Sequence, residues 1–436
     1  MTTARPAHSR PRRRARRGAA YVLVLSLGLV ISVIGMGVLL TTRVAVRDAT
    51  RTGEVDEAAV LAQSAAEWGM AAIANDTNWR TTYTSGTATA ERPLGRGYVS
   101  FKLVDETDGN LSNGTNDNVR VYGIGRVGSA KRIYSVSLMP SGPGLDVLRT
   151  AAHSGGAAAT SGTVTAAGGP FSSNGSFTVP TGATVTGDVE AASVSLSGTL
   201  TGTSKVMAAK TMPGATVFDQ YKSIATTIAF SSLSSGNLQN AVLSPLTNPY
   251  GLLPNAKGVY YVRVPANGTL TIRQCRLVAT LVVEVDAGGK VATSGSFLWD
   301  PPQADYPALI VKATTGCSVD FGGSTTSLSE ATYATNFNPV GTPYPYTASG
   351  SADVDTSDSY PSELHGVVHV MGTGFTTTLG SNLKTKGCVI VEGSVTYGGG
   401  ISLTSDPTLL TTPPQGYRDA TVLAPLTGTW RWEASP

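Results

Sequence analysis

Residues 19–40 read AAYVLVLSLGLVISVIGMGVLL, a run of 22 residues without one charged side chain. A helix of about 20 apolar residues spans the hydrocarbon core of a bilayer. Seven arginines and no acid precede the run, at Arg5, Arg10, Arg12, Arg13, Arg14, Arg16 and Arg17. Since flanking arginines stay cytoplasmic, the pattern predicts a single-pass inner-membrane protein with a cytoplasmic N-terminus and exported C-terminal domains.

A cleavable secretory signal is the alternative interpretation of this start. Such a signal has an apolar run of about 7–15 residues, followed by a cleavage site of small residues. Here the run is longer and continues into Thr41-Thr42-Arg43-Val44. We therefore favour a retained membrane anchor over residues 19–40.

The same helix is expected to continue well beyond the membrane. No proline occurs between Pro11 and Pro93. Small and apolar residues recur at alternating spacings of three and four, which is one face of a helix; they are Val55, Ala58, Ala62, Ala65, Gly69 and Ile73. We expect one helix over 19–75, on the order of 85 Å long, with Gly53 as a candidate bend. A simple anchor with a helical stalk fits this pattern too.

Composition indicates a β-rich exported part. The chain has 50 glycines and only 14% charged residues, which suits short strands joined by glycine turns. Its net charge is +3, and removing the seven leader arginines leaves −4, so the basic leader is a topology signal and no nucleic-acid partner is expected. Three separated cysteines, Cys275, Cys317 and Cys388, allow one disulfide or three buried thiols.

The fold class we predict is α+β: a long, partly transmembrane helix with a small antiparallel sheet, then a mostly-β domain. Three runs that alternate with period two predict the sheet. A proline- and glycine-rich stretch near 140–144 marks the boundary. The expected parts are a basic cytoplasmic leader at 1–18, the helix and sheet at 19–140, a linker at 141–147, a β-helix-like domain at 148–416 and a C-terminal tail at 417–436.

The β-helix prediction rests on short strands that recur with glycine corners. Residues 366–370, GVVHV, and 387–391, GCVIV, are offset by 21. A period near 20 suggests a parallel β-helix, taken here as right-handed, in which each coil stacks on the next. The repeat is irregular, so a β-sandwich stays open. Residues 219–239 are the expected helical insertion.

The N-terminal sequence RRG-AAYVLVLSLGL resembles the class III signal of type IV pilin-like proteins. The resemblance implies that a prepilin peptidase cuts between Gly18 and Ala19. It also implies that the apolar face carrying Leu23, Leu27, Val30 and Ile34 serves for anchoring and assembly. Leu23 stands at the fifth mature position, where major pilins have a glutamate, which fits a minor or tip-type subunit.

Two further stretches support this resemblance. Residues 61–79, LAQSAAEWGMAAIANDTNW, are similar to the end of the long helix in PilX-like minor pilins and K-type pseudopilins. Residues 364–416, with DPTLL at 406–410 and PPQG at 413–416, resemble a C-terminal β-helical domain of bacterial pilus-assembly proteins. The GTVT and GTLTG repeats near 161–202 look bactofilin-like. The implied partners are other pilin-like subunits and the prepilin peptidase.

Few residues suggest ligand chemistry. The connection 105–118 is rich in Asp and Asn, and Asp105, Asp108, Asn110 and Asp117 are candidate calcium ligands, because calcium takes six to eight oxygens. Asp-Gly and Asn-Gly hairpin turns are the alternative. A second acidic stretch, with Asp353, Asp355 and Asp358, carries the same two interpretations. Apart from calcium, no cofactor is expected.

No catalytic motif is recognisable in the sequence. His365 and His369 are four residues apart, but on a strand they lie about 13 Å apart and cannot share an ion. We therefore expect no enzymatic activity, and a structural envelope protein is the leading interpretation: a pilin-like minor or tip subunit of a type IV pilus or a type II secretion-like pseudopilus. Alternatives are an anchored β-helix that binds or cleaves polysaccharide or acts as an adhesin, and a bactofilin-like polymer.

Overall fold

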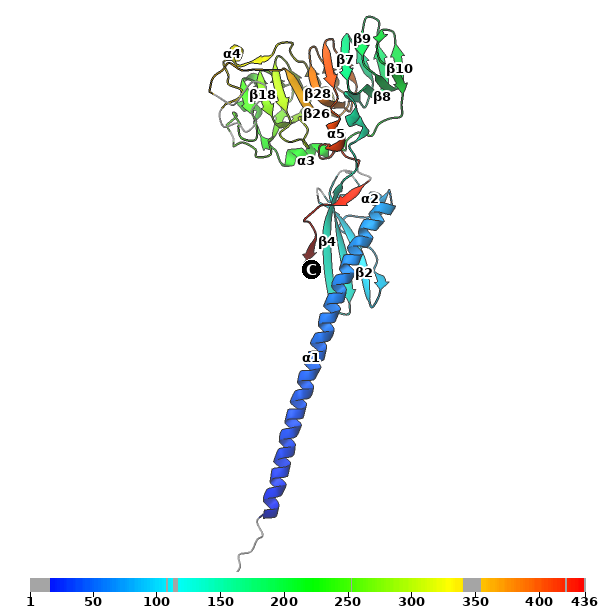
Figure 1. Ribbon diagram of the computed structural model, residues 1–436, viewed down its shortest axis with the longest axis vertical. Helices are drawn as coiled ribbons and strands as arrows, with labels where there is room; N and C mark the ends of the chain where they lie inside the picture. The colour runs from blue at the N-terminus through cyan, green and yellow to red at the C-terminus, as the bar shows by residue number, and fades with distance from the viewer. Residues whose placement is uncertain are drawn as a thin grey trace, which may run out of the picture.

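The computed structural model describes residues 16–106, 109–112, 117–251, 253–339, 354–419 and 422–434. A long helix leads into a small sheet, and a large β-solenoid lies beyond that sheet (Figure 1). The sheet and the helix half that it covers are called the head below. The predicted α+β fold class is confirmed in each of its parts.

Helix α1, Arg16–Asn75, is continuous through Gly53, so the candidate bend does not occur. Alanine is the best helix former, and Ala58, Ala62, Ala65 and Ala66 are all fully buried against the sheet. The helix ends where the polar segment before α2, Trp79–Thr82, begins. At 1.5 Å per residue, 60 residues extend about 90 Å.

The head sheet is antiparallel, as the alternating runs predicted. Its consecutive strands are β1 Arg92–Leu94, β2 Gly97–Asp105, β3 Val119–Val127 and β4 Ala130–Pro140. Two C-terminal strands, β31 Leu423–Pro425 and β32 Arg431–Glu433, also pair with β4. The segment 417–436, expected as a tail, therefore completes the head sheet, and the solenoid is inserted between β4 and β31.

Two chain segments join the head to the solenoid. Ser141 N donates to Val422 O (2.9 Å), Asp419 N to Pro143 O (2.8 Å) and Leu145 N to Tyr417 O (3.0 Å). The outgoing and returning segments thus form one antiparallel ribbon, and the linker expected at 141–147 is half of it.

The solenoid consists of three stacks of parallel strands. Its strands are short, and each coil contributes at most one segment to each stack. The first stack contains, in spatial order, β13 Thr226–Thr227, β16 Val259–Val264, β19 Thr280–Val285, β22 Leu309–Ala313, β26 Glu363–Met371, β28 Lys384–Val391, β5 Ala152–Ser154, the first parts of β8 Phe171–Val179 and β10 Val189–Leu196, and β12 Ser204–Val206.

The other two stacks follow the same order of coils. The second contains β14 Asn237–Leu238, β17 Thr269–Ile272, β20 Lys290–Thr293, β23 Ser318–Phe321, β27 Thr376–Leu379, β29 Val395–Tyr397, β6 Ala158–Thr160 and the later parts of β8 and β10. The third contains β15 Ala241–Leu243, β18 Cys275–Val278, β21 Phe297–Asp300, the starts of β26 and β28, β30 Ile401–Thr404, β7 Thr163–Ala167, β9 Thr184–Thr186 and β11 Thr199–Leu200.

The coils are not stacked in sequence order. The chain enters in the middle of the solenoid and builds outward from β5 to β12. It then crosses to the opposite end and builds back from β13 to β30. The last coil thus meets the first, with β28, β29 and β30 paired to β5, β6 and β7 (Figure 1). We call this junction the seam.

Apolar side chains fill the inside of the coils, and a second apolar layer covers the outer side of the first stack. This layer explains why strands such as residues 259–264, VYYVRV, are apolar on both faces. The elements that cover it are the 3₁₀ helix η1 Asp146–Arg149, α3 Val217–Ser223 and α5 Thr408–Thr411. The helical insertion expected at 219–239 is shorter than predicted and continues as η2 Phe230–Ser232 and η3 Ser234–Gly236 before β14.

A smaller cap lies over the third stack, made of β24 Leu328–Ser329, α4 Glu330–Tyr333 and β25 Ser359–Tyr360. The parallel solenoid was correctly predicted, and the β-sandwich alternative is wrong. Gly366 pairs with Gly387 as the 21-residue offset requires. The right-handed sense stays a prediction.

Candidate anchoring and assembly site

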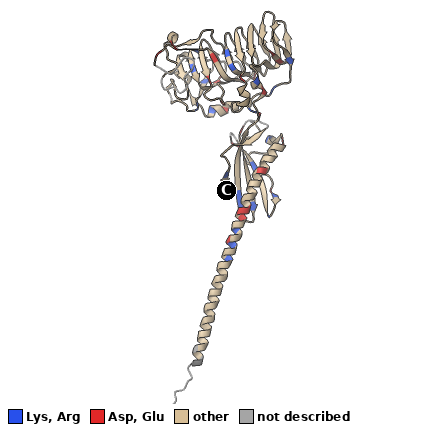
Figure 2. Cartoon of the chain, viewed as in Figure 1, with Lys and Arg blue, Asp and Glu red and all other residues tan. Residues whose placement is uncertain are grey.

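The lower part of α1 exposes an apolar surface that no other described segment of the chain covers. Leu23, Leu27, Val30 and Ile34 are all more than half exposed. In Figure 2 the ribbon of this part of the helix carries neither the colour of acidic nor that of basic residues. In the described part of the chain, Ala20–Asn75 is the one helix that is long and apolar enough to cross a membrane. The N-terminal apolar helix thus suits a membrane anchor or a signal.

Hydroxyl groups inside this apolar part bond to their own helix. Ser26 Oγ donates to Leu23 O (3.0 Å), and Ser32 Oγ donates to Gly28 O (2.8 Å). Polar groups in hydrocarbon need an internal partner, because lipid supplies none. These two serines therefore add little cost to placing the helix in a bilayer.

The expected cleavage bond, between Gly18 and Ala19, lies in the first turn of α1, which begins at Arg16. Gly18 is exposed, and nothing lies within 4 Å of the position a Cβ would take there. The bond is thus unobstructed by the rest of the described chain. Cleavage at this bond stays a prediction.

The upper part of α1 is held by close contact with β3. A Cβ added at Gly123 would clash with Ala62 O and the Ala66 backbone, and one at Gly125 would clash with Ala58 O. Only glycine on the strand and alanine on the helix permit this approach, which fixes the direction in which the helix leaves the head. The sequence signal for it was the alanine stripe.

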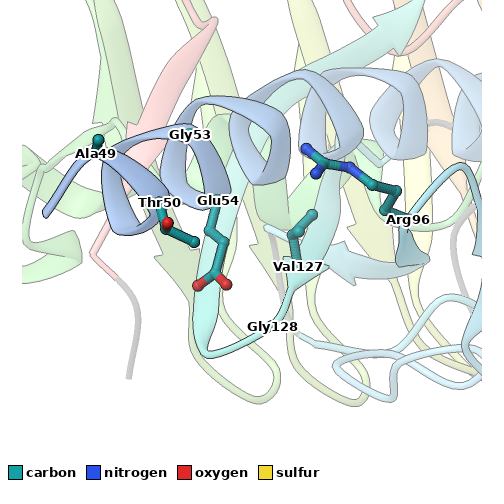
Figure 3. Close-up of a pocket in the computed structure, with 7 residues that line it drawn as sticks. All are labelled: Ala49, Thr50, Gly53, Glu54, Arg96, Val127 and Gly128. Carbon is teal, nitrogen blue, oxygen red and sulfur yellow. The ribbon is translucent and has the colours of Figure 1, made fainter. Parts of the chain in front are cut away.

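A hollow of about 570 Å³ lies at the base of the head, where α1 emerges from the sheet. Figure 3 shows Glu54 of the helix beside the β3–β4 turn at Gly128, and Arg96 reaching toward the same helix from the β1–β2 turn. Arg96 forms an ion pair with Glu57. These charged residues mark the border between the covered and the free part of α1.

The structure brings two of the candidate calcium ligands near a positive charge. Asp105 and Asp117 are both buried, and Arg80 Nη2 donates to the carbonyl of Asp117 at 3.1 Å. Burial lowers the pKa of Arg80, and the nearby carboxylates of Asp117 and Asp105 oppose that shift. The guanidinium therefore supplies positive charge where calcium was expected.

The other two candidate calcium ligands are Asn110 and Asp108. Asn110 Oδ1 accepts from Ser112 N (3.1 Å) and Oγ (2.9 Å), which is turn geometry, and Asp108 lies outside the described residues. Among the residues the structure describes, no three His, Cys, Asp or Glu side chains gather as metal ligands. Calcium binding in this connection stays a prediction.

The second acidic stretch shows turn geometry where it is described. Asp355 Oδ1 accepts from Ser357 N (2.8 Å) and Oγ (2.7 Å). Asp358 Oδ2 accepts from Tyr360 OH at 3.3 Å, and Asp353 lies outside the described residues.

The two histidines of β26 lie in different surroundings, as expected for a strand. His365 Nδ1 is 2.6 Å from Asp300 Oδ1, and its Nε2 is 3.1 Å from Glu363 Oε2. Burial lowers the pKa of His365, but these carboxylates raise it to above its ordinary value. His369 is fully buried, with Nδ1 3.1 Å from Tyr417 OH. They share no ion.

All three cysteines are buried free thiols, so no disulfide links them. Burial raises the pKa of Cys388 to about 12, which leaves the thiol protonated at neutral pH and unreactive. The buried-thiol alternative is therefore the one that the structure shows.

One surface hollow escaped the sequence analysis. It lies at the seam, around Glu392, which the sequence shows only as an isolated acid in an apolar stretch. One of its walls, Gly155–Gly156, comes from a segment more than 200 residues away in sequence, so the sequence around Glu392 did not reveal the hollow.

No protein-family model matches the chain, and no curated protein matches it. Solved structures give weak likenesses. The competence-associated pilin ComZ from Thermus thermophilus aligns with 12% identity and a TM-score of 0.30, covering 87% of this chain and 98% of that one. An ice binding protein from an Antarctic biological consortium aligns with 13% identity and a TM-score of 0.28, over 61% and 91%.

The Shewanella frigidimarina ice-binding protein_1 DUF3494 domain aligns with 10% identity and a TM-score of 0.27, covering 61% of this chain and 98% of that one. Scores this low give no support to a shared function.

Proposed function

We propose that the chain is a structural envelope protein: a pilin-like minor or tip subunit that displays a β-solenoid outside the inner membrane. The observation that carries the proposal is the single helix α1, whose lower part is apolar and exposed and whose upper part packs on an antiparallel sheet. An element of this kind can sit in the membrane before assembly and pack against neighbouring helices afterwards. The role proposed is structural rather than enzymatic.

The processing step follows from the leader. Prepilin peptidase would cut between Gly18 and Ala19 and remove the seven arginines that hold the N-terminus in the cytoplasm. The mature helix could then leave the bilayer and join other pilin-like subunits of a type IV pilus or a type II secretion-like pseudopilus. Because Leu23 replaces the glutamate of major pilins, we assign the chain to the PilX-like minor or tip class.

The insertion of the solenoid supports this arrangement. Both connections to the head lie in one ribbon, at the end of the head away from the membrane helix (Figure 1). The solenoid would thus project away from a filament and leave α1 free to assemble. A tip or minor subunit can carry such a domain, whereas a bulk subunit would have to pack it at every repeat.

N-terminal sequencing of the protein from cell envelopes, with and without prepilin peptidase, tests the proposal. A start at Ala19 that disappears without the peptidase supports it. An intact Met1 contradicts it and leaves an anchored solenoid, the alternative that binds polysaccharide or acts as an adhesin. A Gly18→Leu variant should block processing, whereas Gly28→Leu, in the same helix, should leave it unchanged.

A further inference from the structure

The solenoid has a surface hollow of about 550 Å³ at the seam. Three neighbouring coils contribute to it at the corner between the first and second stacks. Its walls come from the β26–β27 turn and the first residue of β27 (373–376), the β28–β29 turn (392–394) and the β5–β6 turn (155–156). The hollow therefore exists only where the last coil of the returning chain meets the first coil of the outgoing chain.

Among the described residues that line this hollow, Glu392 is the one with a charged side chain. Its side chain is 25% exposed, and its Oε2 accepts from Gly372 N at 2.6 Å. Its Oε1 lies 3.5 Å from Nε2 of the fully buried His369, whose other nitrogen faces Tyr417 OH. The carboxylate is thus held by a backbone N–H and by His369, and it stays partly exposed where it lines the hollow.

The charge of Glu392 is maintained despite its partial burial. Burial raises the pKa of this carboxyl group, but the nearby His369 ring, the Gly372 N–H and the positive charge of Lys312 lower it by more. The net pKa lies below the ordinary value, so Glu392 is ionised at neutral pH and only accepts hydrogen bonds.

The remaining walls are neutral. They combine three hydroxyl groups, of Thr373, Thr376 and Ser394, with the half-buried ring of Phe375. Glycines complete the walls, because a Cβ at Gly155 would clash with Glu392 O. A pocket with a fixed carboxylate, hydroxyls, backbone groups and an aromatic ring suits a ligand that has both hydroxyl donors and an apolar face.

This chemistry excludes two other ligand classes. Among the described residues no lysine or arginine lines the hollow, so an anion would lie beside the Glu392 carboxylate with no cation on the same walls. Calcium takes six to eight oxygens and usually several carboxylates, whereas a single carboxylate is present here. A pyranose satisfies the walls, because its hydroxyls donate to a carboxylate and its C–H face packs on an aromatic ring.

We propose that the seam hollow binds a single uncharged hexose or N-acetylhexosamine unit of a glycan, with Glu392 as its hydrogen-bond acceptor and Phe375 as its stacking surface. The hollow would then make the displayed solenoid a glycan-binding domain. The proposal does not depend on cleavage at Gly18 or on filament assembly, since the site lies wholly within the solenoid.

The test uses the full-length protein in a zwitterionic detergent, because sugar-based detergents would compete. Saturation-transfer NMR would measure binding of the methyl glycosides of glucose, galactose, mannose and N-acetylglucosamine. We expect at least one to bind wild type. Glu392→Gln should weaken that binding about tenfold or more, since it removes a charged acceptor. Glu284→Gln, a control elsewhere on the solenoid, should change it less than about twofold.

A second variant separates binding from folding. Thr373 is exposed on its turn, so Thr373→Trp should fill the hollow and abolish binding while the melting temperature stays at the wild-type value. Binding of none of the four glycosides to wild type would overturn the proposal. So would equal binding by wild type, Glu392→Gln and Thr373→Trp. Neither result bears on N-terminal processing, which keeps this test distinct from that of the proposed function.

Discussion

Ala152 pairs in parallel register with Val389, and Val389 N donates to Ala151 O at 3.2 Å. The first strand of the solenoid therefore stacks on one of its last coils. Each half of the solenoid therefore has unpaired strand edges at the seam unless the other half is folded against it. This long-range closure places the hollow around Glu392 at the point where the two halves meet.

The close packing of α1 on the sheet should be sensitive to one methyl group. Gly123→Ala places a Cβ against Ala62 O and the Ala66 backbone, so it should lower the free energy of unfolding of the head by about 1–3 kcal/mol. Gly53→Ala is the matched control, because Gly53 is helical with nothing within 4 Å, and it should be neutral or stabilise by up to about 1 kcal/mol. Thermal unfolding by circular dichroism measures both, and equal effects would contradict the packing argument.

The sequence predicted strand pairings between segments that are close in sequence better than pairings between distant segments. Residues 366–370 and 387–391 lie one coil apart, so their pairing was visible as a 21-residue offset. The crossing between β12 and β13 left no periodic signal, because it depends on which free edge receives the next coil. The pairing of Leu423 with Pro140 was likewise invisible, since a short strand that completes a distant sheet resembles a tail.

In the candidate site, too, the sequence predicted the features that lie within one segment and missed those that depend on distant segments. The apolar helix and its alanine stripe are periodic features of one segment, and the structure places them as expected. For the acidic connection the sequence left calcium ligands and hairpin turns both open, because it could not show that Arg80 lies beside Asp105 and Asp117. Glu392 appeared isolated, because its neighbours Gly155 and Gly156 are more than 200 residues away in sequence.

A buried lysine fastens the segment that crosses between the two ends of the solenoid. Lys210 is 6% exposed; it pairs with Asp146 of η1 and lies 3.4 Å from Glu190 of β10. Lys210→Met should leave these carboxylates with Arg149 as their remaining partner and lower the free energy of unfolding by about 2 kcal/mol. Chemical denaturation monitored by circular dichroism would measure the loss.

Lys222→Met is the matched control for this lysine. Lys222 pairs with Glu284 but is 38% exposed, and solvent screens such a pair, so the cost should stay within about 1 kcal/mol. If the two variants lose the same stability, the crossing segment is not fastened by Lys210.

His153 should make stability depend on pH in a defined window. It is fully buried with Nδ1 2.9 Å from Ser172 Oγ, and burial, with a smaller effect of Lys210, lowers its pKa from 6.5 to about 4. Between pH 4 and pH 6.5, His153 is therefore protonated in the unfolded chain and neutral in the folded chain. Stability is fully present above pH 6.5 and should fall by about 3 kcal/mol as the pH drops toward 4.

Between pH 4.5 and 6.5, the pH dependence of stability should come mainly from His153. Carboxyl groups with lowered pKa lose their contribution mainly below 4.5, and His365, whose pKa is raised, loses its contribution only above 6.5. His153→Gln should flatten the dependence in this range, whereas His365→Gln should retain it. Denaturant unfolding at four or five pH values would show the slopes, and an unchanged slope in His153→Gln would contradict the assignment.

The C-terminal strand should stabilise the head and leave the solenoid unaffected. Glu433 Oε1 accepts from Ser135 Oγ at 2.6 Å, and the ring of Trp432 lies 4.6 Å from that of Tyr134. Removing residues 430–436 would break both contacts and free one edge of β4, so the free energy of unfolding of the head should fall by about 1–3 kcal/mol. Hydrogen exchange should then rise in β4 and stay unchanged in β19. Trp432→Phe, which keeps a ring on Tyr134, should lose less than half as much, and faster exchange in β19 would show that the two domains unfold together.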